Sequence, residues 1–187
     1  MLGAVGRRVS HRAWRGELAA HASCVPLQPA GDARALCQRR PCPRGARGRE
    51  QVVAVDDLEA AIRDADIISS ATLSNTALIR GAWLKEGAHL DCVGAFKPSM
   101  RETDDVAITS ASLFCDTRAG ALKEGGDYAQ PLAAGLISSH DIKADLFDLS
   151  RGTHRGRATA KEITMFKSVG TAIEDLAAAI AVWQRVK

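Results

Sequence analysis

Two patterns of apolar and polar positions alternate along the chain after residue 51. Short runs of apolar, β-branched and small residues between polar turns predict buried strands, which span residues 67–71, 88–93, 112–116 and 162–166. Apolar residues at helical spacing predict amphipathic helices, the first of them capped by Asp56 or Asp57. These helices span residues 58–65, 118–124, 142–149 and 171–186. Strands alternating with helical connectors predict parallel βαβ units, and therefore an α/β fold.

The stretch 88–102 contains the sharpest of the expected turns. A strand-like run ends at Val93, the small residues Gly94 and Ala95 follow, and Pro98 prevents the strand from continuing. A chain that leaves the carboxyl end of a parallel strand has to bend, and glycine lets backbone approach a bound group closely. Open α/β sheets bind their ligands at this edge, so we expect 88–102 to line a site.

The charge changes sharply near residue 51. Residues 1–50 contain ten Arg, no Lys and three acidic residues, a net charge of +7, so the total of +3 leaves −4 for the remaining chain. Residues 7–50 show no sustained helical or strand period, and their composition buries too little apolar surface to offset the ordering entropy. We interpret this segment as the product of a GC-rich coding region read out of frame, a hypothesis that the encoding DNA sequence tests.

Two other interpretations of the Arg-rich segment stay open. A basic tail for nucleic acid fits the charge but lacks interleaved aromatic residues, so we expect no nucleic-acid partner. A zinc site from Cys24, Cys37, Cys42 and His21 lacks the paired C-x-x-C spacing of structural zinc ligands, and His89, His140 and His154 are dispersed, so we expect no metal.

The cysteines and the hydropathy indicate a cytoplasmic protein. The total of five cysteines is odd, and Cys92 and Cys115 lie inside strand-like runs, which favours reduced thiols. No apolar run reaches the roughly 18 residues of a membrane span, and the Arg-rich start lacks the apolar core of a secretory signal. We therefore expect no membrane partner.

Blocks of sequence, in order, resemble the ornithine cyclodeaminase and mu-crystallin family of nicotinamide-dependent proteins. The blocks are DADIISSAT at 64–72, WLKEGAHL at 83–90, VGAFKPSMRE at 93–102, LKEGGD at 122–127 and EITMFKSVG at 162–170. The resemblance implies a Rossmann-like, doubly wound parallel sheet, only part of which is present, closed by the C-terminal helix. It also implies that a substrate and dimerisation domain belongs to the longer family members, which are expected to form homodimers.

This resemblance suggests a division of the chain and a set of ligand contacts. Residues 1–51 replace the first half of the nucleotide-binding domain, 52–140 form its remainder, and 141–187 form a helical segment that packs toward the absent domain. NAD or NADP is expected at Gly6, Thr72, Leu73, Val93, Gly94, Ala95 and Ser168, with substrate at Val169 and Gly170. Residues 2–6 resemble the end of a first Rossmann strand that enters its glycine turn. Arg8 stands where a dinucleotide fingerprint has its second glycine, which removes the close backbone approach to a pyrophosphate.

Plainer interpretations of the same residues remain open. The loop from Thr72 onward is also typical of a Ser/Thr turn, and residues 168–171 form either an anion-binding helix start or an ordinary capped helix. Asp104 and Asp105, like Asp145 and Asp148, are expected to be caps or solvated faces, and His89 a core or edge histidine.

The residue two positions after Gly94 separates branches of the family. Ornithine cyclodeaminases carry an aspartate there, and this chain has Phe96, which cannot exchange a proton. The chain thus resembles the bacterial ketimine reductases, which reduce Δ1-pyrroline-2-carboxylate or Δ1-piperideine-2-carboxylate with NAD(P)H. The alternatives are an ornithine cyclodeaminase, a non-catalytic NAD(P)H-binding protein like mu-crystallin, or a product without a stable fold. The lysine and arginines that hold substrate lie in the absent domain, so we assign no catalytic residue and expect this chain alone to be inactive.

Overall fold

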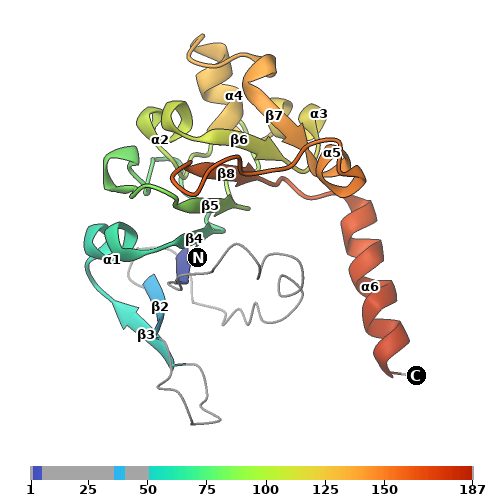
Figure 1. The fold of residues 1–187 in the computed structure, drawn as a ribbon, viewed down its shortest axis with the longest axis horizontal. Helices are drawn as coiled ribbons and strands as arrows, with labels where there is room; N and C mark the ends of the chain where they lie inside the picture. Colours follow the sequence, from blue (N-terminus) through green and yellow to red (C-terminus); the bar gives the residue numbers. More distant parts are fainter. Residues whose placement is uncertain (1, 6–35, 41–50, 187) are drawn as a thin grey trace.

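In the described part of the chain, eight strands form one sheet in the order β3-β2-β1-β4-β5-β8-β6-β7 (Figure 1). This computed structural model describes residues 2–5, 36–40 and 51–186. The strands are β1 (Leu2–Val5), β2 (Leu36–Arg40), β3 (Gln51–Val55), β4 (Ile67–Ser70), β5 (His89–Cys92), β6 (Ser112–Cys115), β7 (Ile142–Asp145) and β8 (Thr164–Lys167). The helices are α1 (Leu58–Asp64), α2 (Asp105–Ser110), α3 (Arg118–Lys123), α4 (Gly126–Ala133), α5 (Leu146–Arg151) and α6 (Ala172–Val186), with 3-10 turns η2 (Gly81–Trp83) and η3 (Ser139–Asp141).

The five strands β4, β5, β8, β6 and β7 are parallel, as the alternation of strands and helices predicts. The last strand in the sequence, β8, lies between β5 and β6, with Cys92 opposite Lys167 and Lys167 opposite Cys115. The carboxyl ends of β4, β5, β8 and β6 therefore meet at one edge of the sheet. We call the residues that follow these strands at this edge, 71–74, 93–96, 116–117 and 168–170, the carboxyl rim.

The strand β1 does not run as the sequence suggested. Residues 2–6 resemble a first Rossmann strand, which would lie parallel to its neighbours, but β1 pairs antiparallel with β4 and places Val5 opposite Ile67. Its carboxyl end therefore lies at the amino end of β4, away from the carboxyl rim. The prediction that residues 2–6 form a first Rossmann strand leading to the rim is wrong. Gly6 itself, like the proposed zinc ligands, lies outside the described residues.

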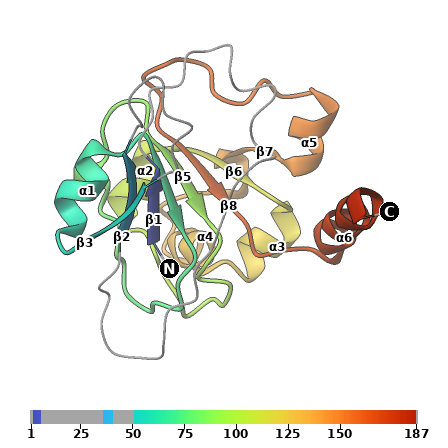
Figure 2. The same cartoon turned by 90° about the horizontal axis from the view of Figure 1, so that it is seen from below.

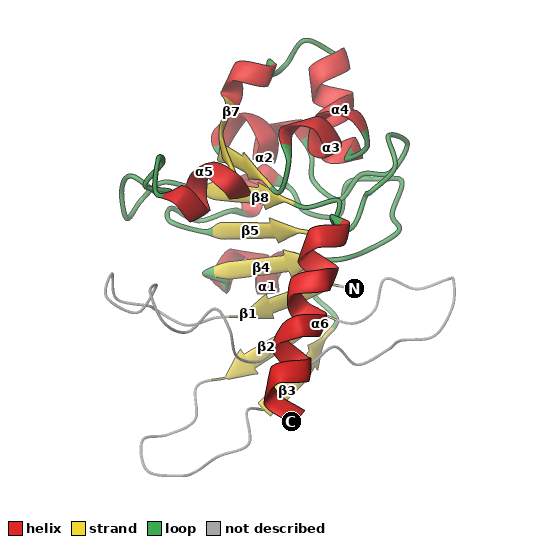
Figure 3. Cartoon of the chain, turned by 90° about the vertical axis from the view of Figure 1, so that its right-hand side faces the viewer, coloured by secondary structure: helices red, strands yellow, loops and turns green. Residues whose placement is uncertain are grey.

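One hydrophobic core fills the space between the parallel strands and helices α1 to α4. Ile62 of α1, Leu90 of β5, Met165 of β8 and Tyr128 of α4 are all fully buried there. The Tyr128 hydroxyl donates a hydrogen bond to the Phe114 carbonyl at 2.9 Å, which satisfies its buried polar end. Helices α5 and α6 lie on the opposite side of the sheet from α1 and α2, as Figure 3 shows. The α/β, doubly wound interpretation is thus confirmed.

Side-chain caps explain where several helices begin. The carboxylates of Asp57, Asp104 and Asp145 accept hydrogen bonds from backbone N–H groups in the first turns of α1, α2 and α5, and Asp145 forms a capping box with Asp148. Asp104, Asp145 and Asp148 are therefore caps, as expected, and Asp104 also accepts from the Gly81 N–H at 2.8 Å.

In the second half of the chain, four expected elements are present as β6, α3, β8 and α6, and others differ from the expectation. Residues 142–149, expected as one helix, divide into strand β7 and helix α5, so the segment 141–187 contributes two strands to the sheet as well as helices. Helices α2 and α4 were not expected. Helix α6 does not close the sheet: it stands apart from it (Figure 2), none of its residues is buried, and Ile173, Leu176 and Trp183 of its apolar face are exposed.

Candidate functional site

The carboxyl rim brings together the residues that were expected to hold a cofactor. The backbone N–H groups of Val93 and Gly94 donate to the Ser70 carbonyl, and the N–H of Ala95 donates to the Thr72 carbonyl at 3.2 Å. The Ser168 N–H donates to the Cys92 carbonyl at 3.0 Å. Thr72, Gly94 and Ser168 therefore lie on one rim, although they are far apart in the sequence.

Gly94 is required by the rim itself. A Cβ atom built on Gly94 would lie 2.3 Å from the Thr72 nitrogen and 2.3 Å from Oε1 of Glu102, closer than real Cβ contacts. The glycine therefore allows the turn after β5 to pack against the turn after β4 and against a buried carboxylate. The next residue, Ala95, has a positive φ of 48°, a conformation that is strained for alanine and is held by its hydrogen bonds to Thr72 and Gly126.

The outer surface of the rim is apolar and exposed. Leu73, Val93 and Phe96 are 67%, 44% and 42% exposed, and the Lys97 ammonium lies 5.8 Å from the centroid of the Phe96 ring. Most rim amides are used inside the protein, so this surface offers flat backbone and apolar contact instead of amide donors. Such a wall suits a planar ring better than a phosphate.

The turn before α6 already binds an anion, and the anion belongs to the protein. Oδ2 of Asp116 accepts hydrogen bonds from the Val169 N–H at 2.8 Å, the Gly170 N–H at 2.9 Å and the Ser168 hydroxyl at 3.1 Å. Asp116 itself is only 1% exposed. The negative group that these amides meet is a side chain of the protein, so they are not free for a ligand phosphate. Asp116 was not expected from the sequence.

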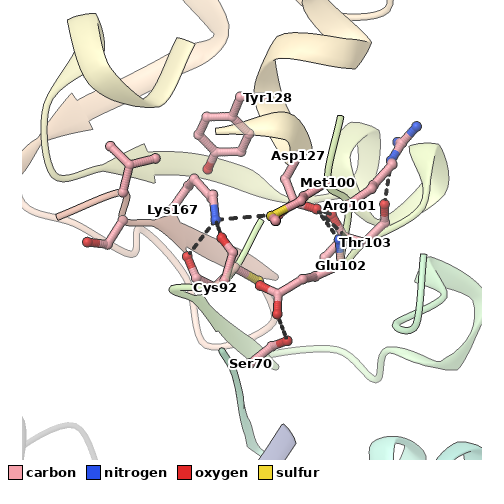
Figure 4. A network of polar contacts seen from close by, with 12 residues as sticks. Ser70, Cys92, Met100, Arg101, Glu102, Thr103, Asp127, Tyr128 and Lys167 are labelled. Atoms are coloured by element: carbon pink, nitrogen blue, oxygen red, sulfur yellow. Dashed lines mark hydrogen bonds and ion pairs between the residues drawn. The ribbon is translucent and has the colours of Figure 1, made fainter. Parts of the chain in front are cut away.

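A buried polar network lies behind the rim, and no pattern in the sequence predicted it. Glu102, Asp127 and Lys167 are fully buried and, with Thr103 and Ser70, link the tips of β4, β5 and β8 to the start of α4 (Figure 4). An Arg-Glu pair after a turn and a Lys after an apolar strand are common on surfaces, so only the placement of these residues distinguishes them.

The remaining titratable candidates do not face the rim. His89 begins β5 at the opposite edge, where its Nδ1 lies 2.8 Å from Oγ1 of Thr164, and burial lowers its pKa to about 4. Burial also raises the pKa of the Cys92 thiol well above its usual value and that of Cys115 to about 12, so both free thiols are unreactive. The residues that the structure describes contain no cluster of metal ligands and no helix long and apolar enough to cross a membrane.

A parallel α/β sheet whose strand tips form one rim defines the Rossmann-like class of proteins. Comparison with known sequences then places the chain in a family: residues 39–187 match the ornithine cyclodeaminase/mu-crystallin family, and the chain belongs to it. The match begins before residue 52, where the resemblance was expected to start.

The relatives include reductases. The chain is 45% identical over 125 residues to the Δ1-pyrroline-2-carboxylate reductase of Paracoccus denitrificans, covering 67% of this chain and 40% of that protein. It is 39% identical over 126 residues to the ketimine reductase mu-crystallin of Mus musculus, covering 67% and 37%. The structure of the Thermococcus litoralis Δ1-pyrroline-2-carboxylate reductase in complex with NADH and L-proline matches with a TM-score of 0.66 at 35% identity, covering 70% and 40%. The chain thus spans about two fifths of the length of these relatives.

Proposed function

We propose that this chain is the nucleotide-binding portion of an NAD(P)H-dependent reductase of cyclic imine carboxylates, of the Δ1-pyrroline-2-carboxylate and Δ1-piperideine-2-carboxylate class. The observation that carries the proposal is the carboxyl rim, where Thr72, Gly94 and Ser168 meet beside exposed apolar surface. The names of the relatives support the substrate class, and the iminosuccinate reductase of Paracoccus denitrificans in complex with NAD+, 29% identical with a TM-score of 0.62, supports the cofactor.

The rim residues fit the nicotinamide end of such a cofactor. Gly94 leaves no side chain between the turns, and Leu73 and Val93 provide exposed apolar surface against which a ring can lie. Ala95 is fully buried, so its expected contact with the cofactor is limited to holding the turn. When bound, the cofactor supplies the hydride that reduces a substrate C=N bond. The contribution of the chain is to orient the ring and to exclude water from one of its faces. Val169 and Gly170, held by Asp116, are proposed to lie beside the substrate.

The residue at position 96 favours imine reduction over ornithine cyclodeamination. Phe96 is half exposed at the rim and has no group that accepts or donates a proton, so it cannot take the role that we expect for an aspartate there. We also propose that the 187-residue chain alone binds the cofactor without turnover, because the rim residues Thr72, Leu73 and Val93 have no side chain that transfers a proton near neutral pH. A binding protein like mu-crystallin is therefore the second candidate.

A cofactor titration tests the binding proposal. NADH and NADPH are titrated separately into the 187-residue protein, and quenching of protein fluorescence and enhancement of NADH emission are followed. We expect saturable binding that Leu73→Asp weakens about tenfold or more. The introduced carboxylate would place a negative charge against the apolar nicotinamide ring and would repel the phosphates of the cofactor. Leu136→Asp is the matched control: Leu136 is also exposed but lies toward the amino ends of β6 and β8. Equal effects of the two substitutions would contradict a cofactor site at the rim.

A turnover assay separates the candidate activities. Δ1-pyrroline-2-carboxylate and Δ1-piperideine-2-carboxylate are supplied with NADH or NADPH, ornithine is supplied in parallel for ammonia release, and the Paracoccus denitrificans reductase serves as positive control. We expect binding but no turnover from the 187-residue chain, and imine reduction without ammonia from a full-length protein that contains these residues. Ammonia release from ornithine would refute the reductase assignment.

The remaining features of the proposal concern the context of the protein. We propose a cytoplasmic protein, which the buried free thiols Cys92 and Cys115 support, and a homodimer for the full-length form. The division at residues 51 and 140, with an out-of-frame segment before residue 51, remains a proposal that the encoding DNA tests. If no other reading frame encodes a strand followed by a complete glycine fingerprint, the frameshift hypothesis fails.

A further inference from the structure

Three ionisable side chains with no solvent exposure lie directly behind the carboxyl rim. Glu102, Asp127 and Lys167 are each 0% exposed and come from the turn after β5, the first turn of α4 and the end of β8 (Figure 4). Burying such groups is costly unless each is paired or hydrogen-bonded. Their partners are therefore informative, and most of them are backbone groups of the rim.

Glu102 holds the turn that follows β4. Its Oε1 accepts a hydrogen bond from the Ser70 hydroxyl at 2.6 Å and another from the Thr72 N–H at 2.5 Å. Its Oε2 has no hydrogen-bond partner among the described residues. One oxygen of Glu102 thus fixes the peptide group of Thr72, the residue that faces the proposed cofactor.

Lys167 holds the turn that follows β5. Its ammonium donates hydrogen bonds to the Cys92 carbonyl at 3.2 Å and to the Gly94 carbonyl. The Gly94 carbonyl and the Ala95 N–H belong to the same peptide group and point in opposite directions. Because the carbonyl points inward to Lys167, the N–H is directed toward the Thr72 carbonyl. Lys167 therefore sets the orientation of the peptide that joins the two turns.

Asp127 connects these two contacts. Its Oδ1 accepts from the Glu102 N–H at 2.9 Å and from the N–H and hydroxyl of Thr103 at 2.8 Å each, and its Oδ2 lies 3.5 Å from Nζ of Lys167. The network thus contains two acids and one base, and apolar side chains would fill the same space at a lower desolvation cost. What apolar side chains would not provide is a fixed direction for the Thr72 and Gly94 peptide groups.

We propose that Glu102 and Lys167 are positioning residues for the cofactor rim, which act on the bound nicotinamide through the peptide groups of Thr72 and Gly94. The identity of the ligand, a nicotinamide cofactor, rests on the proposed function. The effect of Glu102 and Lys167 on the rim does not depend on it. Neither side chain reaches solvent, so neither touches the cofactor. Their substitution acts on binding by releasing the turns after β4 and β5.

Amide hydrogen exchange measured by NMR in the absence of cofactor tests the effect on the rim. In Lys167→Met, which keeps the length of the side chain but removes the donors, we expect exchange at Gly94 and Ala95 to accelerate at least about tenfold relative to Trp83 and Ser112, because the opening is local. Trp83 and Ser112 donate to Arg80 and Ile163 away from the rim and serve as reference amides. Lys161→Met is the matched control, since the Lys161 side chain is 80% exposed and its ammonium pairs with Glu86 at 3.0 Å.

A second, smaller variant keeps the test decisive if Lys167→Met does not fold. Ser70→Ala removes one hydroxyl that donates to Glu102, and Ser70 is itself 0% exposed. We expect faster exchange at Thr72 and an NADH dissociation constant raised about threefold to tenfold, because the effect must pass through Glu102. Glu102→Gln retains an acceptor oxygen, so we expect it to preserve both readouts within about threefold.

The outcomes distinguish this inference from the proposed function. Exchange at Thr72, Gly94 and Ala95 that follows Trp83 and Ser112 in every variant would overturn the positioning role, whatever the protein binds. If the wild-type protein binds neither NADH nor NADPH, the proposed function fails, and the exchange data still decide whether Glu102 and Lys167 hold the rim. If NADH affinity is lost in Lys167→Met, with rim exchange selectively faster and Lys161→Met unchanged, both proposals are supported.

Discussion

Replacing Asp116 by alanine should loosen the turn that carries Ser168, Val169 and Gly170. The carboxylate accepts three hydrogen bonds from this turn through Oδ2 and one from the Thr117 N–H through Oδ1 at 2.5 Å. It is the link between the end of β6 and the start of α6. Asp116→Ala removes all four acceptor contacts and leaves a small cavity in a position that is almost fully buried.

The magnitude follows from how well water can replace the lost acceptor. A hydrogen bond to a charged group contributes about 1.5 to 3 kcal/mol, but Gly170 is exposed and Ser168 is half exposed, so water satisfies part of the released donors. We therefore expect a loss of about 3 kcal/mol in the free energy of unfolding, which corresponds to a decrease of roughly 6 to 12 °C in the melting temperature for a domain of this size. Asp116→Asn keeps one oxygen and should lose about 1 to 2 kcal/mol.

Urea unfolding followed by circular dichroism measures these values, and Asp56→Asn is the control. Asp56 is exposed, so its substitution should change the free energy of unfolding by less than about 0.5 kcal/mol. If the free energy of unfolding of Asp116→Ala is within about 1 kcal/mol of the wild-type value, the carboxylate does not hold the turn. The assignment of Ser168 to Gly170 to the rim would then lose its structural basis.

Three further predictions concern single residues. Gly94→Ala should destabilise the protein by about 2 kcal/mol or more and abolish NADH binding, because its Cβ would meet Thr72 and Glu102 at 2.3 Å. The pKa of His89 is lowered from its ordinary value of 6.5 to about 4 in the folded protein. Between pH 6.5 and 4 the unfolded chain therefore binds a proton at His89 that the folded protein does not bind. The free energy of unfolding should fall by about 3 kcal/mol as the pH decreases from 6.5 to 4. Alkylation of Cys115 at pH 8 should be roughly a thousandfold slower in the native than in the unfolded protein, because its pKa is raised to about 12.

Each of these predictions has an internal comparison. Gly152→Ala adds a Cβ in open space at a positive φ of 72°, so it should cost only about 1 kcal/mol, and an equal loss in both glycine variants would argue against the clash. His89→Gln should flatten the pH dependence of urea unfolding, and His140→Gln, at an exposed position, should leave it intact. Peptide mapping by mass spectrometry follows Cys115, and equal native and unfolded labelling rates would contradict its burial.

The sequence was sufficient for strands β4, β5, β6 and β8 of the parallel sheet and for α1, because their periods are short and uninterrupted. It failed at residues 142–149, where alternate burial of Ile142 and Ala144 in β7 merges with the helical spacing of Leu146 and Leu149, so one helical period fits both. It missed α4 because Gly125 and Gly126, which follow the expected helix 118–124, are typical of a helix end. Gly126 is instead the first residue of α4, and glycine is needed there because a Cβ would lie 1.8 Å from the Met100 carbonyl oxygen.

The candidate rim was predicted better than the groups that hold it in place. Thr72, Gly94 and Ser168 follow strand-like runs, so their meeting at one edge follows from parallel pairing alone. Asp116, Glu102 and Lys167 act through contacts with residues that lie far away in the sequence, up to 75 positions apart for the Lys167–Cys92 pair. No local pattern marks such contacts, because the same residue types are ordinary on surfaces.

The position of β8 explains why the fold and the candidate site depend on the same residues. As the last strand in the sequence, β8 inserts between β5 and β6, and until it does so both strands have an unpaired edge. The insertion places Lys167 behind Gly94 and brings Ser168 beside Asp116 in one step. The rim is therefore incomplete in any partly folded form that lacks β8, and a substitution that weakens β8 pairing should loosen both halves of the rim together. Independent effects on the turn at Gly94 and on the turn at Ser168 would show that another element orders them.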